Sequence, residues 1–266
     1  MGVRRVSCQY GMAVYSRFPI VSSDVRSFQM LKWSSMPSAK RPKIVDKAKA
    51  DEKFFHSDDV WRELRLSSKS HWDVPIKIGD QTLHVLASHP TPPVFDGPED
   101  RNGCRNHDEI RLFKDYVEAT EDSDYIVDDQ GKVGPLAKDA HFVILGDLNS
   151  DPKDGSGISQ GIVELLECKR VTSAFVPTSE GAVEAAKIQG KSNEKHVGDA
   201  GQDTGDFNDN GPGNLRIDFV LPSNNCRVVN GGVFWPTQDQ LKNVDPKLVD
   251  ASDHHLVWLD IELLKP

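Results

Sequence analysis

Apolar and polar residues alternate in several short runs of the chain, which is the pattern of half-buried β-strands. Residues 61–78 and 81–90 form two such runs, and Gly79–Asp80 between them makes a good hairpin turn. Residues 11–21 predict a short buried strand before a proline-marked turn, and residues 25–33 are expected to pair with it. Three strands are expected at the end of the chain, at residues 215–223, 227–235 and 254–263.

Between residues 106 and 121 the spacing of the apolar residues changes to that of an α-helix. Ile110, Phe113 and Val117 are spaced i, i+3 and i+7, so they would share one face of an amphipathic helix. The run HFVILG at residues 141–146 predicts a buried strand. Helical and strand-like segments therefore mix along the chain, which favours an α/β protein.

Two segments lack this patterning. Residues 34–59 are rich in Lys, Asp and Ser and predict an exposed excursion. Residues 177–214 hold few large apolar side chains and predict a long loop, a kind of segment that is often functional. A short helix is expected at residues 157–167, and neither a repeat nor a linker divides the chain. We therefore expect one domain over residues 1–266, with an α/β (α+β) fold in which a two-layer β-sandwich is flanked by helices as α/β/β/α.

Composition narrows the class of protein. Of the 266 residues, 37% are apolar and 27% are charged, as is typical of soluble globular proteins. No apolar stretch approaches the ~20 residues of a membrane helix, and the N-terminus lacks an apolar core of signal-peptide length. The net charge of −9 is not the basic footprint of strong nucleic-acid binding, whereas carboxylates suit a hard metal ion.

The cysteines leave the cellular compartment open. They form no CxxC pair, so a zinc site is not expected. Their pairing cannot be read from the sequence, and free thiols stay an alternative. The four residues are Cys8, Cys104, Cys168 and Cys226.

Polar residues occur at strand ends where an ordinary core would not need them. The run VILGDLNSDP ends in Asp147 and Asn149, whose side chains should point the same way because strand side chains alternate. Simple turn formation is the alternative explanation of these two residues. Asp218 lies inside an apolar strand, where a carboxylate costs free energy unless a partner such as a histidine pairs with it. The other candidates at strand ends are His89, Asp253 and His254.

The order and spacing of these motifs resemble those of a known family. GDLNSDP, RIDFVLPS and SDHHLVW are similar to the three C-terminal motifs of the endonuclease/exonuclease/phosphatase superfamily. That superfamily includes deoxyribonucleases, abasic-site endonucleases, sphingomyelinases and inositol-polyphosphate phosphatases. GMAVYSRFPI resembles its early strand, SHPTPP its central histidine strand, and FDGPEDRNGCRNHDEIR a bacterial branch. The resemblance covers almost the whole chain.

The resemblance implies a site at one rim of the sandwich, where water attacks phosphorus in line. It implies that Asp147 orients or deprotonates this water and that Asn149 helps to hold the water and the phosphate. His254 would donate to a phosphoryl oxygen, Asp218 would fix the tautomer and charge of His254, and His89 would contact the phosphate.

A divalent metal ion is also implied by the resemblance, usually magnesium, with manganese or calcium as alternatives. Asp253 and Asp147 are the expected metal ligands, Asp253 either in direct contact or through a neighbouring group. His255 should point to the other face of its strand and is not expected in the site.

The N-terminus departs from the family pattern. Relatives carry an Asn and a metal-binding Glu in two strands before the segment that begins at Gly11, but here ten residues precede Gly11 and none is Asp or Glu. The first glutamate is Glu52, in the exposed excursion. N-terminal strands are therefore expected to be missing, and an open sheet edge would favour self-association. We expect weak metal binding and low activity unless another carboxylate substitutes.

Three hypotheses about function remain at this point. The first is a metal-dependent phosphodiesterase that cleaves nucleic acid. The second is a phosphatase or phosphodiesterase for small or lipid-linked phosphate esters, which the net charge of −9 favours. The third is a shortened domain that binds phosphate or a partner without turnover. The missing glutamate is the observation that suggests this hypothesis.

Overall fold

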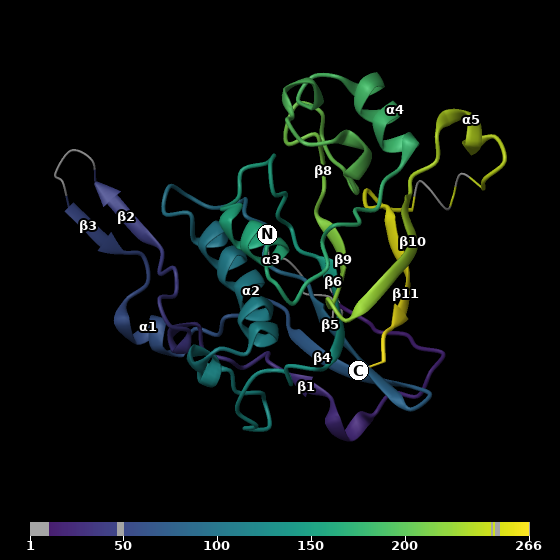
Figure 1. Ribbon diagram of the computed structural model, residues 1–266. Helices are drawn as coiled ribbons and strands as arrows, with labels where there is room; N and C mark the ends of the chain where they lie inside the picture. Colours follow the sequence, from purple (N-terminus) through teal and green to yellow (C-terminus); the bar gives the residue numbers. More distant parts are fainter. Residues whose placement is uncertain (1–10, 47–50, 246, 248–250, 266) are drawn as a thin grey trace.

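A five-stranded mixed sheet forms the centre of the fold (Figure 1), in a computed structural model that describes residues 11–46, 51–245, 247 and 251–265. The strand order is β1-β4-β5-β6-β9. The parallel pair is β5 with β6, and the other neighbours are antiparallel. The strands are β1 (Arg26–Ser27), β4 (His71–Ile78), β5 (Gln81–Ser88), β6 (His141–Asp147) and β9 (Asp218–Pro222). The β4–β5 hairpin turns at Gly79–Asp80, as the sequence predicts.

Two helices cover one face of this sheet. They are α2 (Arg101–Glu118) and α3 (Gln160–Leu166), and they pack against each other as well. Ile110, Phe113 and Val117 of α2 are buried in one core cluster with Phe142 and Ile144 of β6. The helical period in the sequence is therefore confirmed, although α2 begins at Arg101, because the polar first turns carry no apolar signal.

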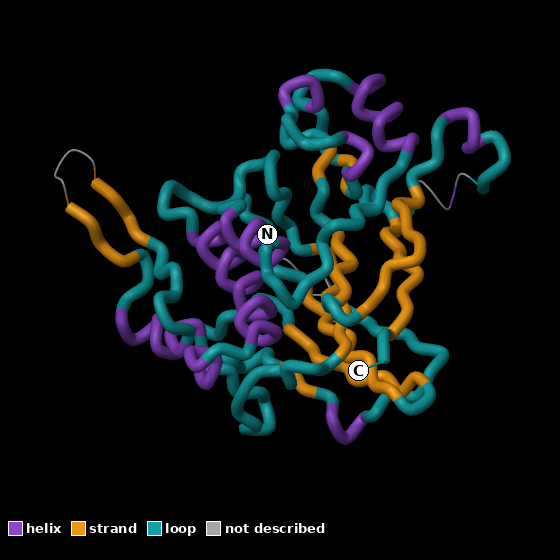
Figure 2. Tube along the Cα trace, viewed as in Figure 1, coloured by secondary structure: helices purple, strands orange, loops and turns teal. Residues whose placement is uncertain are grey.

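The other face of the sheet packs against a two-stranded antiparallel sheet, visible as paired strands in Figure 2. This second sheet consists of β10 (Cys226–Phe234) and β11 (Leu256–Leu263). Ile261 and Leu263 of β11 contact the buried cluster that includes Val85 and Val143 of the central sheet. The expected α/β architecture, a sheet layer flanked by helices, is thus confirmed, and the layer opposite the helices contains these two strands.

Three sequence predictions about local structure are wrong. Residues 25–33 do not pair with residues 11–21, because their strand β1 pairs with β4. Residues 11–21 form no strand; only Ile20 makes an isolated bridge, to Ile76, and Tyr15 is 94% exposed. This run has the composition of a strand, but it pairs with β4 only at its end, where Val21 N donates to Pro75 O and Lys77 N donates to Pro19 O, each at 2.9 Å. Residues 177–214 are not one loop, because they contain α4 (Glu180–Gln189), which Ser179 caps at its start. The alanine-rich segment of α4 has high helix propensity, which the polar surroundings concealed.

The remaining elements are short. The β2–β3 hairpin projects away from the rest of the molecule (Figure 1), which agrees with the exposed excursion predicted there. These elements are β2 (Lys43–Asp46), β3 (Asp51–Phe54), α1 (Asp58–Glu63), β7 (Gly205–Asp206), β8 (Asn214–Leu215) and α5 (Gln238–Leu241). Cys104, Cys168 and Cys226 are free thiols, and Cys8 lies outside the described residues. In the described part of the chain, no helix combines the length and apolarity that a membrane span requires.

Candidate active site

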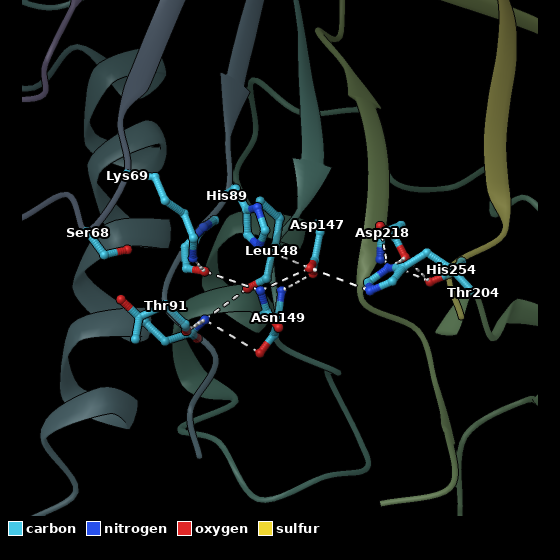
Figure 3. A network of polar contacts seen from close by, with 12 residues as sticks. Ser68, Lys69, His89, Thr91, Asp147, Leu148, Asn149, Thr204, Asp218 and His254 are labelled. Carbon is cyan, nitrogen blue, oxygen red and sulfur yellow. Dashed lines mark hydrogen bonds and ion pairs between the residues drawn. The ribbon is translucent and has the colours of Figure 1, made fainter. Parts of the chain in front are cut away.

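The sheet topology brings four distant segments to one edge. Because β5 and β6 are parallel, both end at this edge, where His89 follows β5 and Asp147 closes β6. The antiparallel strand β9 begins there, and its first residue, Asp218, is paired with Asp147. His254 lies just before β11 and faces the same place, as Figure 3 shows. The strand-end residues made these side chains candidates in the sequence, and the family resemblance implied that they meet in one site.

Asp147 and Asn149 form a local unit after β6. The Asn149 backbone amide donates to Asp147 Oδ1 at 2.8 Å, and Asn149 Nδ2 donates to Asp147 Oδ2 at 3.0 Å. Between them Leu148 points the other way and is 1% exposed in the helix-side core. Asn149 has a positive φ of 50°, a conformation that asparagine tolerates better than most residues. The turn therefore exists, and it fixes the carboxylate rather than merely ending the strand.

His89 lies on the far side of Asp147 from the His254 ring (Figure 3). His89 Nε2 is 3.3 Å from Asp147 Oδ2, and His254 Nε2 is 3.9 Å from the same oxygen. Both rings are partly exposed, at 24% and 31% of the side chain. Two partly exposed imidazoles thus flank one carboxylate.

His254 is held by Asp218. His254 Nδ1 lies 3.0 Å from Asp218 Oδ2 and 3.2 Å from Asp218 Oδ1. The hydrogen bond to Asp218, together with the negative charges of Asp218 and Asp147, raises the pKa of His254 to about 9. The imidazole is therefore protonated at neutral pH, and its Nε2–H is available as a donor toward the site.

Thr204 is a supporting residue that the sequence did not reveal. Its hydroxyl donates to Asp218 Oδ2 at 2.9 Å and accepts from the backbone amides of Ile217 and Asp218 at 3.1 and 3.0 Å. The Phe207 ring meets the His254 ring edge-on, with centroids 5.7 Å apart. Both residues come from the segment predicted as a loop, where nothing in the local pattern distinguishes them.

Helix α2 anchors the loops that carry the site. Asn106 Nδ2 donates to the backbone oxygens of Thr91 and Leu148, each at 2.9 Å. The carboxylate of Glu109, which is fully buried, accepts from the backbone amides of Thr91 and Ser68 at 2.5 and 2.6 Å. The loops after β5 and β6 are thus tied to one turn of the same helix, which positions the side chains that these loops carry.

Lys69 lies at the rim of this network (Figure 3). Its Nζ donates to the backbone oxygen of Pro90 at 3.0 Å, and Asn149 Nδ2 donates to the same oxygen at 3.2 Å. Burial lowers the pKa of Lys69 from its ordinary value. Nothing in the local sequence distinguishes this residue, since lysines in polar runs are usually solvated.

Asp253 and His255 lie outside this centre. The Asp253 side chain is exposed, and its backbone oxygen accepts from the Asp206 amide at 2.8 Å. Its role as a metal ligand stays a prediction. His255 is buried and stacked on Trp235, with ring centroids 3.7 Å apart, so it points away from the site as the strand alternation indicates.

The donor atoms of Asp147, Asp218 and His254 lie within 4.8 Å of one another. Of the three side chains, the two carboxylates carry the oxygens that Mg²⁺ or Mn²⁺ prefers, whereas a protonated imidazole cannot coordinate a metal. Magnesium typically uses one or two carboxylates and completes its shell with water and phosphate oxygens. The chemistry of this donor set therefore fits a hard divalent cation.

Comparisons with known proteins agree with the motifs. The model of the family described as "Endonuclease/Exonuclease/phosphatase family" matches residues 3–254. No curated protein matches the sequence significantly.

Several solved structures resemble the fold at low identity. An endonuclease/exonuclease/phosphatase from Beutenbergia cavernae is 16% identical, with 94% of this chain and 46% of that chain covered and a TM-score of 0.48. A family protein from Leptotrichia buccalis is 14% identical, with 75% and 55% covered and a TM-score of 0.38. A mutant beta toxin from Staphylococcus aureus with bound magnesium ions is 11% identical, with 75% and 55% covered and a TM-score of 0.33. The chain spans about half the length of these three structures.

Proposed function

Because the chain belongs to the endonuclease/exonuclease/phosphatase family, we propose that it hydrolyses phosphate esters with the help of a divalent metal ion. The observation that carries this proposal is the group formed by Asp147, Asp218 and His254, in which a carboxylate faces a histidine that a second carboxylate keeps protonated. Phosphoryl transfer needs positioning and neutralisation of charge more than covalent help, and this group supplies both.

Each side chain has a distinct proposed role. Asp147 orients the attacking water and accepts its proton, while Asn149 holds the Asp147 carboxylate through two hydrogen bonds. His254 donates from Nε2–H to a phosphoryl oxygen, and Asp218 keeps this imidazole charged and oriented. His89 contacts the phosphate from the opposite side of Asp147. The charge that develops on the phosphoryl oxygens thus meets two imidazole donors.

A metal ion would be held by carboxylate oxygen, with Asp147 as the first ligand and Asp253 as the second predicted ligand. When bound, a divalent ion neutralises phosphate charge and acidifies water. Magnesium is the proposed ion, and manganese is the substitute to test beside it.

Nucleic acid is the proposed substrate, because the bacterial motif FDGPEDRNGCRNHDEIR resembles nuclease-like members of the family. A small or lipid-linked phosphate ester is the second candidate. The net charge of −9 favours this second substrate class, because a polyanionic strand is repelled by an acidic surface.

The test measures hydrolysis of plasmid DNA and of bis(p-nitrophenyl) phosphate with magnesium, manganese or EDTA. We expect metal-dependent turnover that falls about a hundredfold or more in His254→Ala, since it loses a donor to the phosphoryl group. His56→Ala is the matched control, because His56 lies in the exposed β3–α1 connection, and this variant should keep wild-type turnover. Equal turnover of wild type and His254→Ala would refute the proposed site. Turnover of the small ester alone would favour the second substrate class.

A further inference from the structure

A second pocket lies beside the candidate active site and is built differently from it. Its volume is ≈ 250 Å³. Three loops form its walls: the one after β5, the one after β6 and the β7–β8 connection. The lining is mostly apolar and includes Pro93, Val94, Phe95, Phe207, Pro212 and Leu215.

This pocket shares two residues with the surroundings of the catalytic group. Asn149, which holds the Asp147 carboxylate, lines the pocket with its other side. Phe207 lines it too, and its ring meets the His254 ring at an interplanar angle of 83°. A phosphate bound against Asp147 and His254 therefore lies next to this pocket, within reach of its own substituent.

The electrostatics of the walls select against a charged occupant. No Lys, Arg or His is among the described residues that line the pocket. The two carboxylates in the wall, Asp151 and Asp154, are engaged by backbone amides: Asp151 Oδ2 accepts from Arg216 N and Asp154 Oδ2 from Gly198 N, both at 2.8 Å. Their charges remain and would repel a second phosphate, so an uncharged group fits better.

The shape of the walls favours a ring over a long chain. Phe207 and Phe95 offer aromatic faces, and prolines 92, 93 and 212 offer rigid flat ones. A volume of ≈ 250 Å³ lies below the ~300–1,000 Å³ of ordinary ligand pockets, so an extended acyl chain does not fit. Stacking on aromatic side chains supplies affinity without demanding hydrogen bonds.

Phe95 shows that the mouth of the pocket is unusual. This residue has a positive φ of 65°, a strained conformation for a bulky side chain, and it is 91% exposed. Such strain at a pocket mouth is a recognised mark of functional sites, and a ring bound there would cover the exposed Phe95 side chain.

We propose that this pocket binds an uncharged aromatic ring carried by the phosphate ester, such as an aryl group or a nucleobase. The proposal rests on the proposed function, because it places the phosphate between Asp147 and His254. On this proposal the pocket selects the substituent of the phosphate ester. Esters with an aromatic substituent then bind more tightly than esters that carry further phosphates.

The test uses phosphonates, which mimic a phosphate monoester but cannot be hydrolysed at the P–C bond. Calorimetry with magnesium compares methyl-, n-hexyl- and phenylphosphonate binding to the wild-type protein. We expect phenylphosphonate to bind about tenfold more tightly than methylphosphonate, which is the scale of one aromatic contact. Equal binding of these two, or tighter binding of n-hexylphosphonate than of phenylphosphonate, would overturn the proposal. Thymidine 5′-monophosphate against 2-deoxyribose 5-phosphate then separates a nucleobase from a simple aryl group as the preferred ring.

Two variants at one exposed wall position locate the ring. Val94 is 37% exposed, and its structural hydrogen bond uses the backbone oxygen, which accepts from Asn102 Nδ2 at 2.7 Å, so both variants keep it. Val94→Asp adds a third carboxylate to the wall and should abolish the preference for phenyl over methyl. Val94→Thr, of the same size and uncharged, should retain it. A preference that survives in Val94→Asp would place the ring elsewhere and overturn the proposal.

These experiments distinguish a failure of the pocket proposal from a failure of the proposed function. Hydrolysis of bis(p-nitrophenyl) phosphate without a phenyl preference in the phosphonates would overturn the pocket assignment alone. A phenyl preference that Val94→Asp removes, in a protein without hydrolysis, would overturn the proposed function and support the pocket.

Discussion

At the scale of single residues, the centre of the site is a histidine whose charge depends on one carboxylate. Asp218 contacts His254 Nδ1 through both of its oxygens, and Thr204 holds that carboxylate from behind. A buried aspartate that fixes a histidine is a recurring device for keeping a proton on the nitrogen that faces the substrate. In this chain the three residues come from β9, the segment before β7 and the segment before β11.

Replacing Asp218 by Asn tests this dependence. The amide keeps the shape and one acceptor but removes the negative charge, so the pKa of His254 should fall from about 9 toward the ordinary histidine value. NMR titration of the imidazole in EDTA measures this pKa without any metal. We expect turnover to fall about fourfold at pH 7, since about a quarter of the molecules carry the charged donor when the pKa lies near 6.5. An unchanged pKa near 9 in Asp218→Asn would show that another group charges the histidine.

At the scale of elements, the close approach of β5 and β6 depends on a residue without a side chain. Gly146 has a φ of +146°, and a Cβ at this position would lie 1.9 Å from the Ser88 backbone oxygen. The position of a Cβ is fixed by the backbone, and the Ser88 oxygen is itself a backbone atom, so no side-chain rotation can relieve the clash. Gly146 immediately precedes Asp147, and this contact therefore also sets how near the Asp147 carboxylate lies to His89.

Gly146→Ala should consequently destabilise the protein and displace the site. We expect the free energy of unfolding to fall by about 3 kcal/mol, the upper range for overpacking, as measured by urea denaturation. Gly131→Ala is the control, because Gly131 also has a positive φ, of 86°, but nothing lies within 4 Å of the added Cβ. The control should lose only about 1 kcal/mol, the cost of the backbone conformation. Equal losses in the two variants would show that β5 and β6 can separate without cost.

The sequence predicted those elements whose pattern is local. The hairpin at Gly79–Asp80, the apolar strand β6 and the amphipathic face of α2 are all encoded by neighbouring residues, and the structure has each of them. The residues at strand ends were also predicted, because strand boundaries and the order of motifs can be read from the sequence. The structure brings these residues together: His89, Asp147, Asn149, Asp218 and His254.

Features that depend on three-dimensional partners could not be predicted in this way. Thr204 contributes to the site only because the tertiary structure brings its hydroxyl to Asp218, and no local sequence pattern indicates that contact. The run at residues 11–21 looks like a strand, yet only its end pairs with β4, and composition cannot show how far such pairing extends. Helix α4 was missed for the opposite reason, since its helix-forming residues lie within a polar segment.

At the scale of the whole molecule, a buried histidine joins the sheet to the helix layer. His71, the first residue of β4, is fully buried, its Nε2 is 2.9 Å from the Glu109 backbone oxygen of α2, and Ser67 Oγ contacts its Nδ1. Burial lowers the pKa of His71 to about 4. The neutral imidazole satisfies both contacts, because one nitrogen donates and the other accepts.

Stability should therefore decrease in mild acid. The pKa of His71 is lower in the folded than in the unfolded protein, so between about pH 6.5 and pH 4 the unfolded chain binds more protons. We expect the His71 contribution to the free energy of unfolding to fall by about 2 kcal/mol between pH 7 and pH 5, at about 1.4 kcal/mol per pH unit below the unfolded pKa. His71→Gln should be less stable at pH 7 and should lose less on acidification, in urea titrations at both pH values. Parallel losses in the variant and the wild type would assign the acid sensitivity to other groups.

The parallel pairing of β5 with β6 also has a kinetic consequence. Parallel neighbours cannot be joined by a tight turn, and here the chain between them, from residue 89 to residue 140, includes the whole of α2. Contacts between segments so far apart form slowly, because the entropy of closing the intervening loop is lost before the contacts stabilise it. His89 begins that connection, and Asp147 closes the strand β6 that follows it. We therefore expect the active site to assemble late in folding, after α2 has docked, so that a newly made chain is compact before it can bind phosphate.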